Sequence, residues 1–133
     1  MDSLAASQKQ LDLDEPPVSQ LLPSVSVIIP AFNEAQTIEE SLRRISEYFS
    51  GPRRLREIVV VNDGSTDGTA EVVRKFASDK HFVRLITSNA NRGKGYSVRQ
   101  GMLTGTGDLL LMCDADLSTP IEELEKLLPW LQR

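Results

Sequence analysis

The chain has 133 residues, of which 40% are apolar, and its 15 Lys and Arg against 19 Asp and Glu give a formal charge of −4. This length fits one domain with a core of its own, and the single cysteine, Cys113, excludes an intrachain disulfide. The near-neutral charge after residue 24 disfavours nucleic-acid binding, and no apolar run approaches the roughly 20 residues of a membrane span. We therefore expect a cytoplasmic protein that binds no nucleic acid.

Residues 1–24 show neither helical nor strand periodicity, and we expect them to form a mobile leader. From Val25 onward, short runs rich in β-branched residues alternate with longer amphipathic stretches. This alternation is typical of βα units on a parallel sheet with helices on both faces. The first strand is predicted over residues 25–30, ended by Pro30, and its helix is predicted to begin near residue 36.

Three further units follow the first. The first of their strands is near-continuously apolar, which is typical of a parallel strand that is covered on both faces. The predicted elements are a strand at 57–62 with a helix through 70–76, a strand at 82–87 with a helix through 98–103, and a strand at 108–113.

The last predicted helix begins after the fourth strand. Thr119 is placed as its N-cap, Pro120 at its first helical position, and Glu122 where a capping box would need it. The pattern predicts that the helix still runs at Arg133. Its predicted core face consists of Leu127, Leu128, Trp130 and Leu131.

Polar or charged groups follow every predicted strand. In an open α/β sheet, ligands bind beyond the carboxyl ends of the strands, where the strand order reverses. Four such segments on one rim favour a ligand site there. They are residues 31–34, 63–68, 91–95 and 114–118.

Asp114 and Asp116 lie two residues apart directly after a buried strand. On an extended segment this spacing turns both carboxylates to the same side, where they could share one divalent cation. Oxygen ligands of this kind suit Mg²⁺ or Mn²⁺. The alternative is that one aspartate caps the last helix and the other is solvated, although Thr119 already supplies a cap.

Asp63 stands at the end of the second strand, in a Gly/Ser/Thr/Asp turn. A calcium loop is excluded because Arg74 occupies the position where a bidentate glutamate is needed. The carboxylate could accept a hydrogen bond from a nucleobase edge, or it could belong to a capped turn. The role of Glu34 also has two alternatives, since its carboxylate could cap the first helix or accept a hydrogen bond from a sugar hydroxyl.

Arg92 and Lys94 flank a glycine at the predicted start of a helix. The spacing of a P-loop is absent, which excludes that class of nucleotide site. Their charges and the free N–H groups of the helix would still favour a diphosphate. The alternative is a solvated basic turn.

Four segments in this order resemble one known family. They read VIIPAFNEA at 27–35, IVVVNDGSTDGT at 58–69, NRGKGY at 91–96 and DADLSTP at 114–120. Together they resemble the inverting family 2 glycosyltransferases, and within that family the dolichyl-phosphate and polyprenyl-phosphate sugar synthases, particularly the glucosyltransferases. The resemblance covers residues 25–133. It implies a Rossmann-like GT-A fold, with these residues forming the nucleotide-sugar-binding half of a domain that is incomplete at its C-terminus.

The resemblance also implies where the nucleoside binds. Pro30, Ala31 and Glu34 would line the nucleoside pocket, with Glu34 on the ribose. Asp63 would face the base. UDP-glucose is the favoured donor and GDP-mannose is an alternative.

For the diphosphate, the resemblance implies that Lys94 lies near the nucleotide and that Asp114 sits at the ribose or the metal. Asp116 would bind the Mg²⁺ or Mn²⁺ ion that bridges the diphosphate. Related mannose synthases often carry a glutamine two residues after the second aspartate, where this chain has Ser118.

The implied reaction moves a hexose, with glucose favoured, to a lipid phosphate at the cytoplasmic membrane face. A lipid phosphate is already largely anionic at neutral pH and needs no general base. The alternative is a truncated module that binds nucleotide sugar without transferring it. The chain's predicted fourth strand would then lie near an uncovered sheet edge, and we expect self-association through it.

Overall fold

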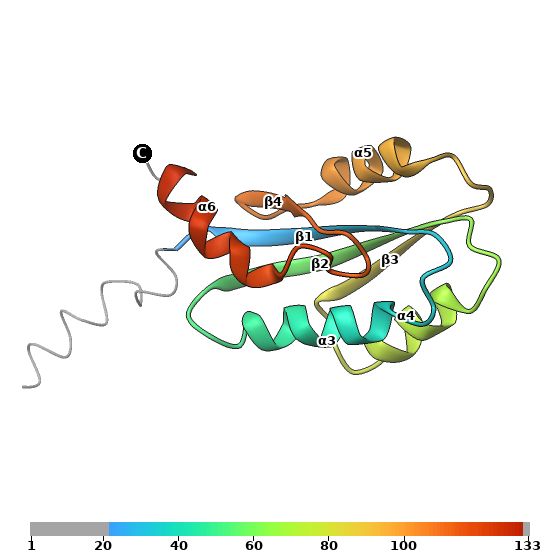
Figure 1. Cartoon of the computed structure of the whole chain (residues 1–133), viewed down its shortest axis with the longest axis horizontal. Helices are drawn as coiled ribbons and strands as arrows, with labels where there is room; N and C mark the ends of the chain where they lie inside the picture. Colours follow the sequence, from blue (N-terminus) through green and yellow to red (C-terminus); the bar gives the residue numbers. More distant parts are fainter. Residues whose placement is uncertain (1–21, 132–133) are drawn as a thin grey trace, which may run out of the picture.

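Four parallel strands form the central sheet of the computed structural model, which describes residues 22–131 (Figure 1). Their order across the sheet is β3-β2-β1-β4. The chain therefore adds β2 and β3 on one side of β1 and then adds β4 on the other side of β1. This is the reversal of strand order at which α/β proteins bind ligands. The strands are β1 Ser24–Ala31, β2 Arg54–Asp63, β3 Val83–Ser88 and β4 Leu109–Met112.

All four strands lie where they were predicted, with differences at their ends: β2 begins three residues earlier than predicted, and the other strands differ by one residue at each end. Ser24, the last residue of the predicted leader, begins β1, and residues 1–21 of that leader lie outside the described residues. The prediction that Pro30 ends the strand was wrong. Pro30 is paired with Val61 and Ala31 with Asn62, because a proline can stand near a strand end where its missing N–H costs little.

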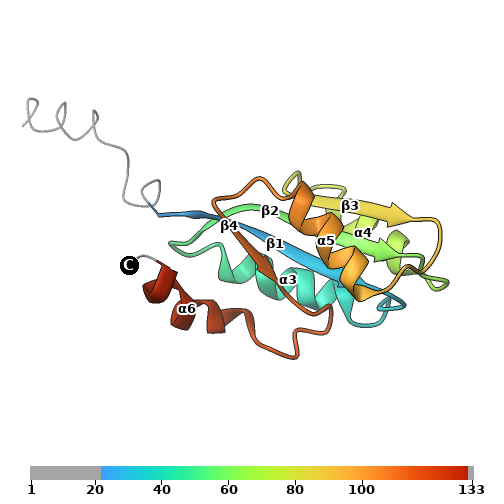
Figure 2. The same cartoon turned by 90° about the horizontal axis from the view of Figure 1, so that it is seen from above.

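Helices cover both faces of the sheet, which confirms the predicted three-layer α/β architecture (Figures 1 and 2). One face is covered by α3 and α4, with a short 3₁₀ turn, η1, and α6 beside α3. The opposite face is covered by α5 alone. The bounds are α3 Ile38–Tyr48, α4 Thr69–Ala77, α5 Lys94–Thr104, η1 Ile121–Glu123 and α6 Leu124–Leu131.

Alternate residues of the strands divide the core into two clusters. Val27 and Ile29 of β1 belong to the larger cluster, whereas Ile28 belongs to a smaller cluster, packed against by Met102 of α5. Helix α5 sits close to the sheet at Gly101, where a Cβ atom would lie 2.2 Å from Cγ2 of Ile28. Any larger residue there would push the helix off the sheet and disturb the loop that precedes it.

The C-terminal helix differs from its prediction in two ways. Pro120 has extended backbone, with ψ of 145°, so it is the flanking residue before η1, and no side chain caps this turn. Thr119 is therefore not the N-cap. Leu128 is buried, but Leu127, Trp130 and Leu131 are 50%, 69% and 59% exposed, so the predicted core face is wrong for these three. Arg133 lies outside the described residues.

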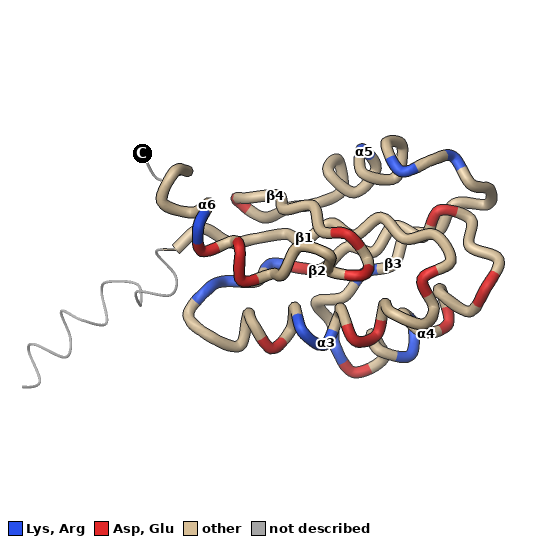
Figure 3. The backbone as a smooth tube through the Cα atoms, in the orientation of Figure 1, with Lys and Arg blue, Asp and Glu red and all other residues tan. Residues whose placement is uncertain are grey.

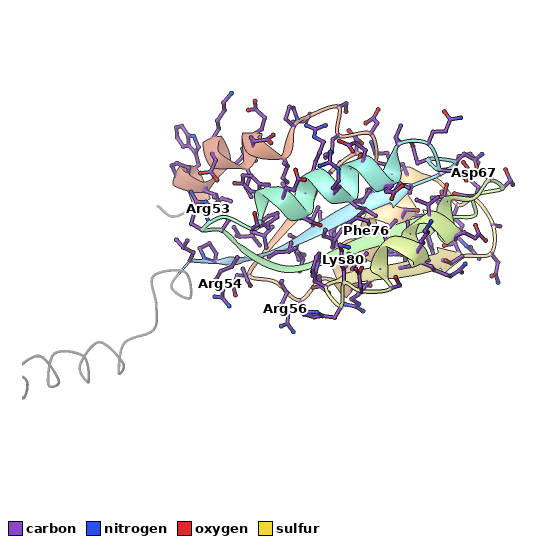
Figure 4. All side chains as sticks on the ribbon, turned by 90° about the horizontal axis from the view of Figure 1, so that it is seen from below. Arg53, Arg54, Arg56, Asp67, Phe76 and Lys80 are labelled. Atoms are coloured by element: carbon purple, nitrogen blue, oxygen red, sulfur yellow. The ribbon has the colours of Figure 1, made fainter. Side chains whose placement is uncertain are left out.

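Leu124 and Leu128 are the residues of α6 that the core buries. They are four residues apart and so occupy one narrow stripe of the helix. In Figure 4, α6 lies beside α3 on one face of the sheet. The stripe is narrow because α6 packs against one neighbouring layer only.

Strand β4 is an edge strand within the described part of the chain. It pairs with β1 from Val25↔Leu109 to Ile28↔Met112, and no strand among residues 22–131 pairs with its other side. Side chains on the α5 face of β4 are partly open to solvent: Leu110 is 39% and Met112 38% exposed. Between residues 22 and 131, no helix combines the length and apolar character needed to cross a bilayer.

Candidate functional site

A cavity of about 420 Å³ opens at the carboxyl ends of the strands. It lies at the reversal of strand order, where the polar segments after β1, β2, β3 and β4 converge. All seven residues proposed from the sequence line it: Pro30, Ala31, Glu34, Asp63, Lys94, Asp114 and Asp116. The structure thus brings together residues that are up to 86 positions apart in the chain.

Asp63 holds the loop that leads into α5. The residue is 3% exposed, and its two carboxylate oxygens accept hydrogen bonds from the backbone N–H groups of Arg92 at 2.8 Å and Gly93 at 2.9 Å. Gly64 lets this loop approach, because its φ is +68° and a Cβ there would lie 2.5 Å from the backbone of Asn91. Each oxygen of Asp63 keeps a further lone pair, so the predicted contact with a base remains a prediction.

The loop after β1 is joined to the loop after β2 through Asn33. The Oδ1 atom of Asn33 accepts hydrogen bonds from the backbone N–H groups of Thr66 at 2.8 Å and Asp67 at 3.3 Å. In return, Ser65 Oγ accepts the Asn33 N–H at 2.9 Å. Asn33 has a φ of +54°, which asparagine tolerates better than most residues. This clamp, which sequence reasoning missed, sets the position of Glu34.

Glu34 does not cap α3 with its side chain. Its Oε2 atom accepts a hydrogen bond from the Thr37 hydroxyl at 2.9 Å, and its backbone carbonyl accepts the N–H groups of Thr37 and Ile38. The Thr69 hydroxyl accepts the Glu34 N–H at 2.9 Å. The carboxylate therefore remains at the cavity wall, where it can accept a hydroxyl.

The two aspartates after β4 lie in a turn rather than on an extended segment. The Leu117 N–H donates to the Asp114 carbonyl at 2.9 Å, and Leu117 has a φ of +49°. The extended geometry predicted for the pair was wrong, but the turn leaves both carboxylates at the cavity. A buried hydrogen bond of 2.6 Å from the Ser41 hydroxyl to the Ala115 carbonyl ties this turn to α3.

Lys94 forms an ion pair across the cavity with Asp114. Its Nζ lies 2.6 Å from Oδ1 of Asp114, and the two side chains are 60% and 39% exposed. The hydrogen bond with Lys94 lowers the pKa of Asp114 and raises the pKa of Lys94. In Figure 3, acidic residues follow β4 and basic residues stand at the start of α5, the two segments that this ion pair joins.

The oxygen donors beside this ion pair fit a hard divalent cation that a diphosphate helps to hold. Asp114, Asp116 and the Ser118 hydroxyl line one wall, and the Ser118 Oγ–Asp114 Oδ2 distance is 3.2 Å. Residues 22–131 contain no group of three or more His, Cys, Asp or Glu placed to hold a metal by themselves. Mg²⁺ commonly binds through one or two carboxylates plus substrate phosphates, and this wall offers such a partial set.

Two further residues stand at or beside the cavity, Cys113 and Ser97. Burial raises the pKa of Cys113 to about 11, with a smaller effect from Asp114, so this thiol is inert at neutral pH. Ser97, in the first turns of α5, lines the cavity and is fully buried. Sequence reasoning missed Ser97, because a serine within a helical pattern carries no signal of its own.

The chain belongs to the glycosyl transferase family 2, whose model matches residues 26–133. It is 43% identical over 108 residues to a dolichyl-phosphate beta-glucosyltransferase of Trichomonas vaginalis, a match that covers 75% of this chain and 31% of the relative. It is 37% identical over 112 residues to the human dolichyl-phosphate beta-glucosyltransferase, covering 77% of this chain and 34% of that protein.

Solved structures support the same fold. A mannosyltransferase from Pyrobaculum calidifontis, in complex with GDP-Man and Mn²⁺, matches with a TM-score of 0.72 and 32% identity, covering 98% of this chain and 39% of that one. A glucosyl-3-phosphoglycerate synthase from Mycobacterium tuberculosis, in complex with Mn²⁺, UDP and phosphoglyceric acid, matches with a TM-score of 0.62 and 27% identity, covering 85% and 39%. The chain therefore shares the GT-A-like fold of these structures, and it spans about a third of the length of the curated relatives that it matches.

Proposed function

We propose that this protein transfers a hexose, with glucose favoured, from a nucleotide-diphosphate sugar to a polyprenyl or dolichyl phosphate, with inversion and with the help of Mg²⁺ or Mn²⁺. The observation that carries the proposal is the cavity at the strand ends, which has Lys94, Asp114 and Asp116 together in its lining. The two similar dolichyl-phosphate glucosyltransferases supply the acceptor class and the preference for glucose. UDP-glucose is the proposed donor, and GDP-mannose is the alternative.

The nucleoside half of the donor is proposed to bind beside β1 and β2. Pro30 and Ala31 offer an apolar wall, Glu34 offers a carboxylate for a ribose hydroxyl, and Asp63 offers its remaining lone pairs to the base. These groups are held by backbone hydrogen bonds before any ligand arrives. Such preorganisation lowers the cost of ordering the site on binding.

The diphosphate half is proposed to bind between α5 and the turn after β4. Asp114 and Asp116 would hold the cation, which stabilises the negative charge that develops on the leaving nucleoside diphosphate. Lys94 would turn from Asp114 toward the diphosphate and add a second positive charge. Its exposed side chain and its single carboxylate partner leave it free to make this change.

The acceptor is proposed to be a lipid phosphate, which the protein meets at the cytoplasmic membrane face. A phosphate monoester has a second pKa of about 6, so its oxygen is largely anionic at neutral pH and attacks the anomeric carbon without a general base. The bond to the anomeric carbon forms on one side while the bond to the nucleoside diphosphate breaks on the other. The sugar therefore changes its anomeric configuration.

A second candidate is a nucleotide-sugar-binding module without transferase activity of its own. The observation that favours it is that the cavity residues with a proposed role all belong to the donor site. Both candidates need the same donor site. They differ in whether this chain also turns the donor over.

Donor binding is tested by thermal shift with UDP and with GDP, each with and without Mn²⁺. We expect a higher melting temperature with nucleotide and Mn²⁺ together, because a ligand that binds only the folded state stabilises it. Asp116→Ala should remove the Mn²⁺-dependent part of the shift. No shift for the native chain, or an equal shift in Asp116→Ala, would contradict the proposed site.

Transfer is tested with radiolabelled UDP-glucose and polyprenyl phosphate in detergent. Label that moves to the lipid phase with wild-type chain, and not with Asp116→Ala, would establish the enzyme and exclude the bare binding module. Donor binding without transfer would favour the module. GDP-mannose in a parallel assay distinguishes the two proposed donors.

A further inference from the structure

One buried polar atom in the lining of the cavity has no hydrogen-bond partner. The Ser97 hydroxyl is buried, and its Oγ makes no hydrogen bond, the one buried side-chain oxygen or nitrogen among residues 22–131 in this condition. Other buried polar side chains nearby are paired: Asp63 accepts two N–H groups and Ser41 donates to a carbonyl. A buried hydroxyl without a partner destabilises the folded state, so a native structure that keeps one calls for an explanation.

The position of Ser97 points to a ligand rather than to a packing defect. Ser97 lines the cavity that also contains Asp63 and Lys94, and it stands in α5 one turn after the helix begins. Its N–H already donates to the Gly93 carbonyl at 3.2 Å, but its hydroxyl does not bond back to that carbonyl. Rotation about the Cα–Cβ bond lets the hydroxyl both donate and accept.

We propose that the Ser97 hydroxyl hydrogen-bonds the nucleoside diphosphate at the floor of the cavity and so contributes to donor affinity. This inference rests on the proposed function, since it assigns one more contact within the same site. The hydroxyl has no hydrogen-bond partner in the free protein and gains one when the nucleotide binds. Ser97 is thus a binding residue that the free protein keeps at a cost to its own stability.

This arrangement makes stability and affinity change in opposite directions in one variant. Ser97→Ala removes an unpaired buried hydroxyl without leaving a large void, so the free protein should melt a few degrees higher. The same variant lacks the contact with the nucleotide, so UDP or GDP should bind about five- to tenfold more weakly in the presence of Mn²⁺. A serine with a merely structural role would not produce this pair of effects.

The experiment is isothermal titration of the full chain with UDP and with GDP in saturating Mn²⁺, together with melting curves of the free proteins. The matched control is Ser46→Ala, because the Ser46 hydroxyl is paired with the Leu42 carbonyl at 2.8 Å and lies outside the cavity. This control should leave nucleotide affinity within about twofold of wild type and should not raise the melting temperature. It makes the same chemical change at a hydroxyl that is already satisfied.

A titration with uridine shows which part of the nucleotide carries the contact. A loss of affinity in Ser97→Ala for both UDP and uridine places the acceptor on the nucleoside, and a loss for UDP alone places it on the diphosphate; either supports the proposal. If wild type and Ser97→Ala bind the nucleotide equally, the hydroxyl has no ligand role and the inference is overturned. If the wild-type chain binds neither UDP nor GDP, the proposed function fails, and this inference fails with it.

Discussion

The two ends of the sheet both carry acids with hydroxyls and cations beside them, but the protein pairs these acids to very different degrees. At the amino end, Glu57 is 5% exposed and accepts hydrogen bonds from Ser26 Oγ at 2.6 Å, the Thr106 N–H at 2.7 Å and Arg84 at 2.6 Å. At the carboxyl end, Asp114 and Asp116 line an open cavity. The difference lies in whether the protein itself satisfies the carboxylate.

Glu57 connects β1, β2, β3 and the turn before β4, so its partners are all fixed by the fold. Burial opposes its ionisation, but hydrogen bonds from Ser26, Thr106 and Arg84 outweigh burial and hold the pKa of Glu57 at about 2. Figure 4 shows Arg53, Arg54 and Arg56 at this end of the molecule and Asp67 at the other. A fully paired network of this kind stabilises the fold and leaves the carboxylate no hydrogen-bonding capacity for a ligand.

The carboxyl end keeps its acids available. Asp114 is paired with Lys94, a flexible and exposed side chain, and Asp116 accepts only the N–H of Ser118, at 3.0 Å, among the contacts seen. Such partners are easily exchanged for a cation and a diphosphate. A fully paired carboxylate such as Glu57 serves stability, whereas a carboxylate with a replaceable partner on a cavity wall is available for binding.

The largest effect is expected from Asp116→Asn at the open end. Loss of one carboxylate should weaken UDP binding in Mn²⁺ by more than about 100-fold, because an amide is a poor ligand for a hard cation. The melting temperature of the free protein should stay within about 2 °C of wild type, since Asp116 is exposed. Titration calorimetry and a melting curve check both. If Asp116→Asn binds UDP in Mn²⁺ as tightly as wild type does, the proposed role of Asp116 in holding the cation is contradicted.

At the closed end, Glu57→Gln should act on stability instead. Removing the charge leaves Ser26, Thr106 and Arg84 with a poorer acceptor, and we expect a loss of about 3 kcal/mol in the free energy of unfolding. Urea denaturation measures this loss. Glu39→Gln, at an exposed position of α3, is the matched control and should change stability by less than about 0.5 kcal/mol. If Glu57→Gln is as stable as wild type, the network does not hold the sheet together.

Acid should destabilise the wild-type chain through the same residue. The pKa of Glu57 is about 2 in the folded protein and near 4.5 when unfolded, so the unfolded chain binds the proton first as the pH falls. The contribution of Glu57, about 3 kcal/mol, is present above pH 4.5 and is lost as the pH falls toward 2. Melting curves from pH 6 to pH 2.5 should therefore fall less steeply for Glu57→Gln.

Glu125 provides an internal reference for the acid experiment. Hydrogen bonds from Arg53 and Tyr48 lower its pKa to about 2 as well, but its side chain is 48% exposed. Screening by solvent reduces the contribution of such a pair to stability. Glu125→Gln should consequently change the acid response less than Glu57→Gln does, and the reverse ranking would contradict the role assigned to burial.

A smaller effect is expected from Lys94→Met. Without the ammonium group, Asp114 is free for a cation, so Mn²⁺ should bind severalfold more tightly in the absence of nucleotide, while UDP should bind severalfold more weakly. Electron paramagnetic resonance of free Mn²⁺ measures the first, and calorimetry the second. Arg99→Met, a substitution of an exposed cation farther along α5, should alter neither. Weaker Mn²⁺ binding in Lys94→Met would show that Lys94 does not compete for Asp114.

The smallest effect concerns the free side of β4. Self-association through this edge, which we predict, should weaken severalfold in Met112→Lys, because a lysine on an edge strand opposes pairing. Light scattering over a range of concentrations measures it. Leu103→Lys places the same charge on α5 and should have little effect. A wild-type chain that is monomeric at every concentration would contradict the prediction.

Local chemistry explains why most of the fold could be predicted. The β-branched runs of β1 and β2 are buried on both faces, and the polar segments after each strand could be assigned to one rim because parallel strands end at the same edge. The predictions failed where the burial of a residue depends on which elements pack against it. Trp130 looked like core from its spacing, but α6 rests on one layer and buries only the stripe of Leu124 and Leu128.

The site divides in the same way. Residue types and their spacing within each loop predicted that Asp63, Lys94, Asp114 and Asp116 lie at one site, and all four line the cavity. Carboxylates and cations after apolar strands are recognisable locally. Tertiary structure alone decided that Asp63 clamps the Arg92–Gly93 backbone, that Lys94 faces Asp114 across the cavity, and that the Ser97 hydroxyl is left without a partner. Each of these depends on which groups of distant segments come within about 3 Å of each other, a distance at which hydrogen bonds form. Spacing along the sequence does not give distances between segments that are far apart in the chain. Whether a polar atom is hydrogen-bonded, solvated or buried without a partner therefore depends on how these segments pack.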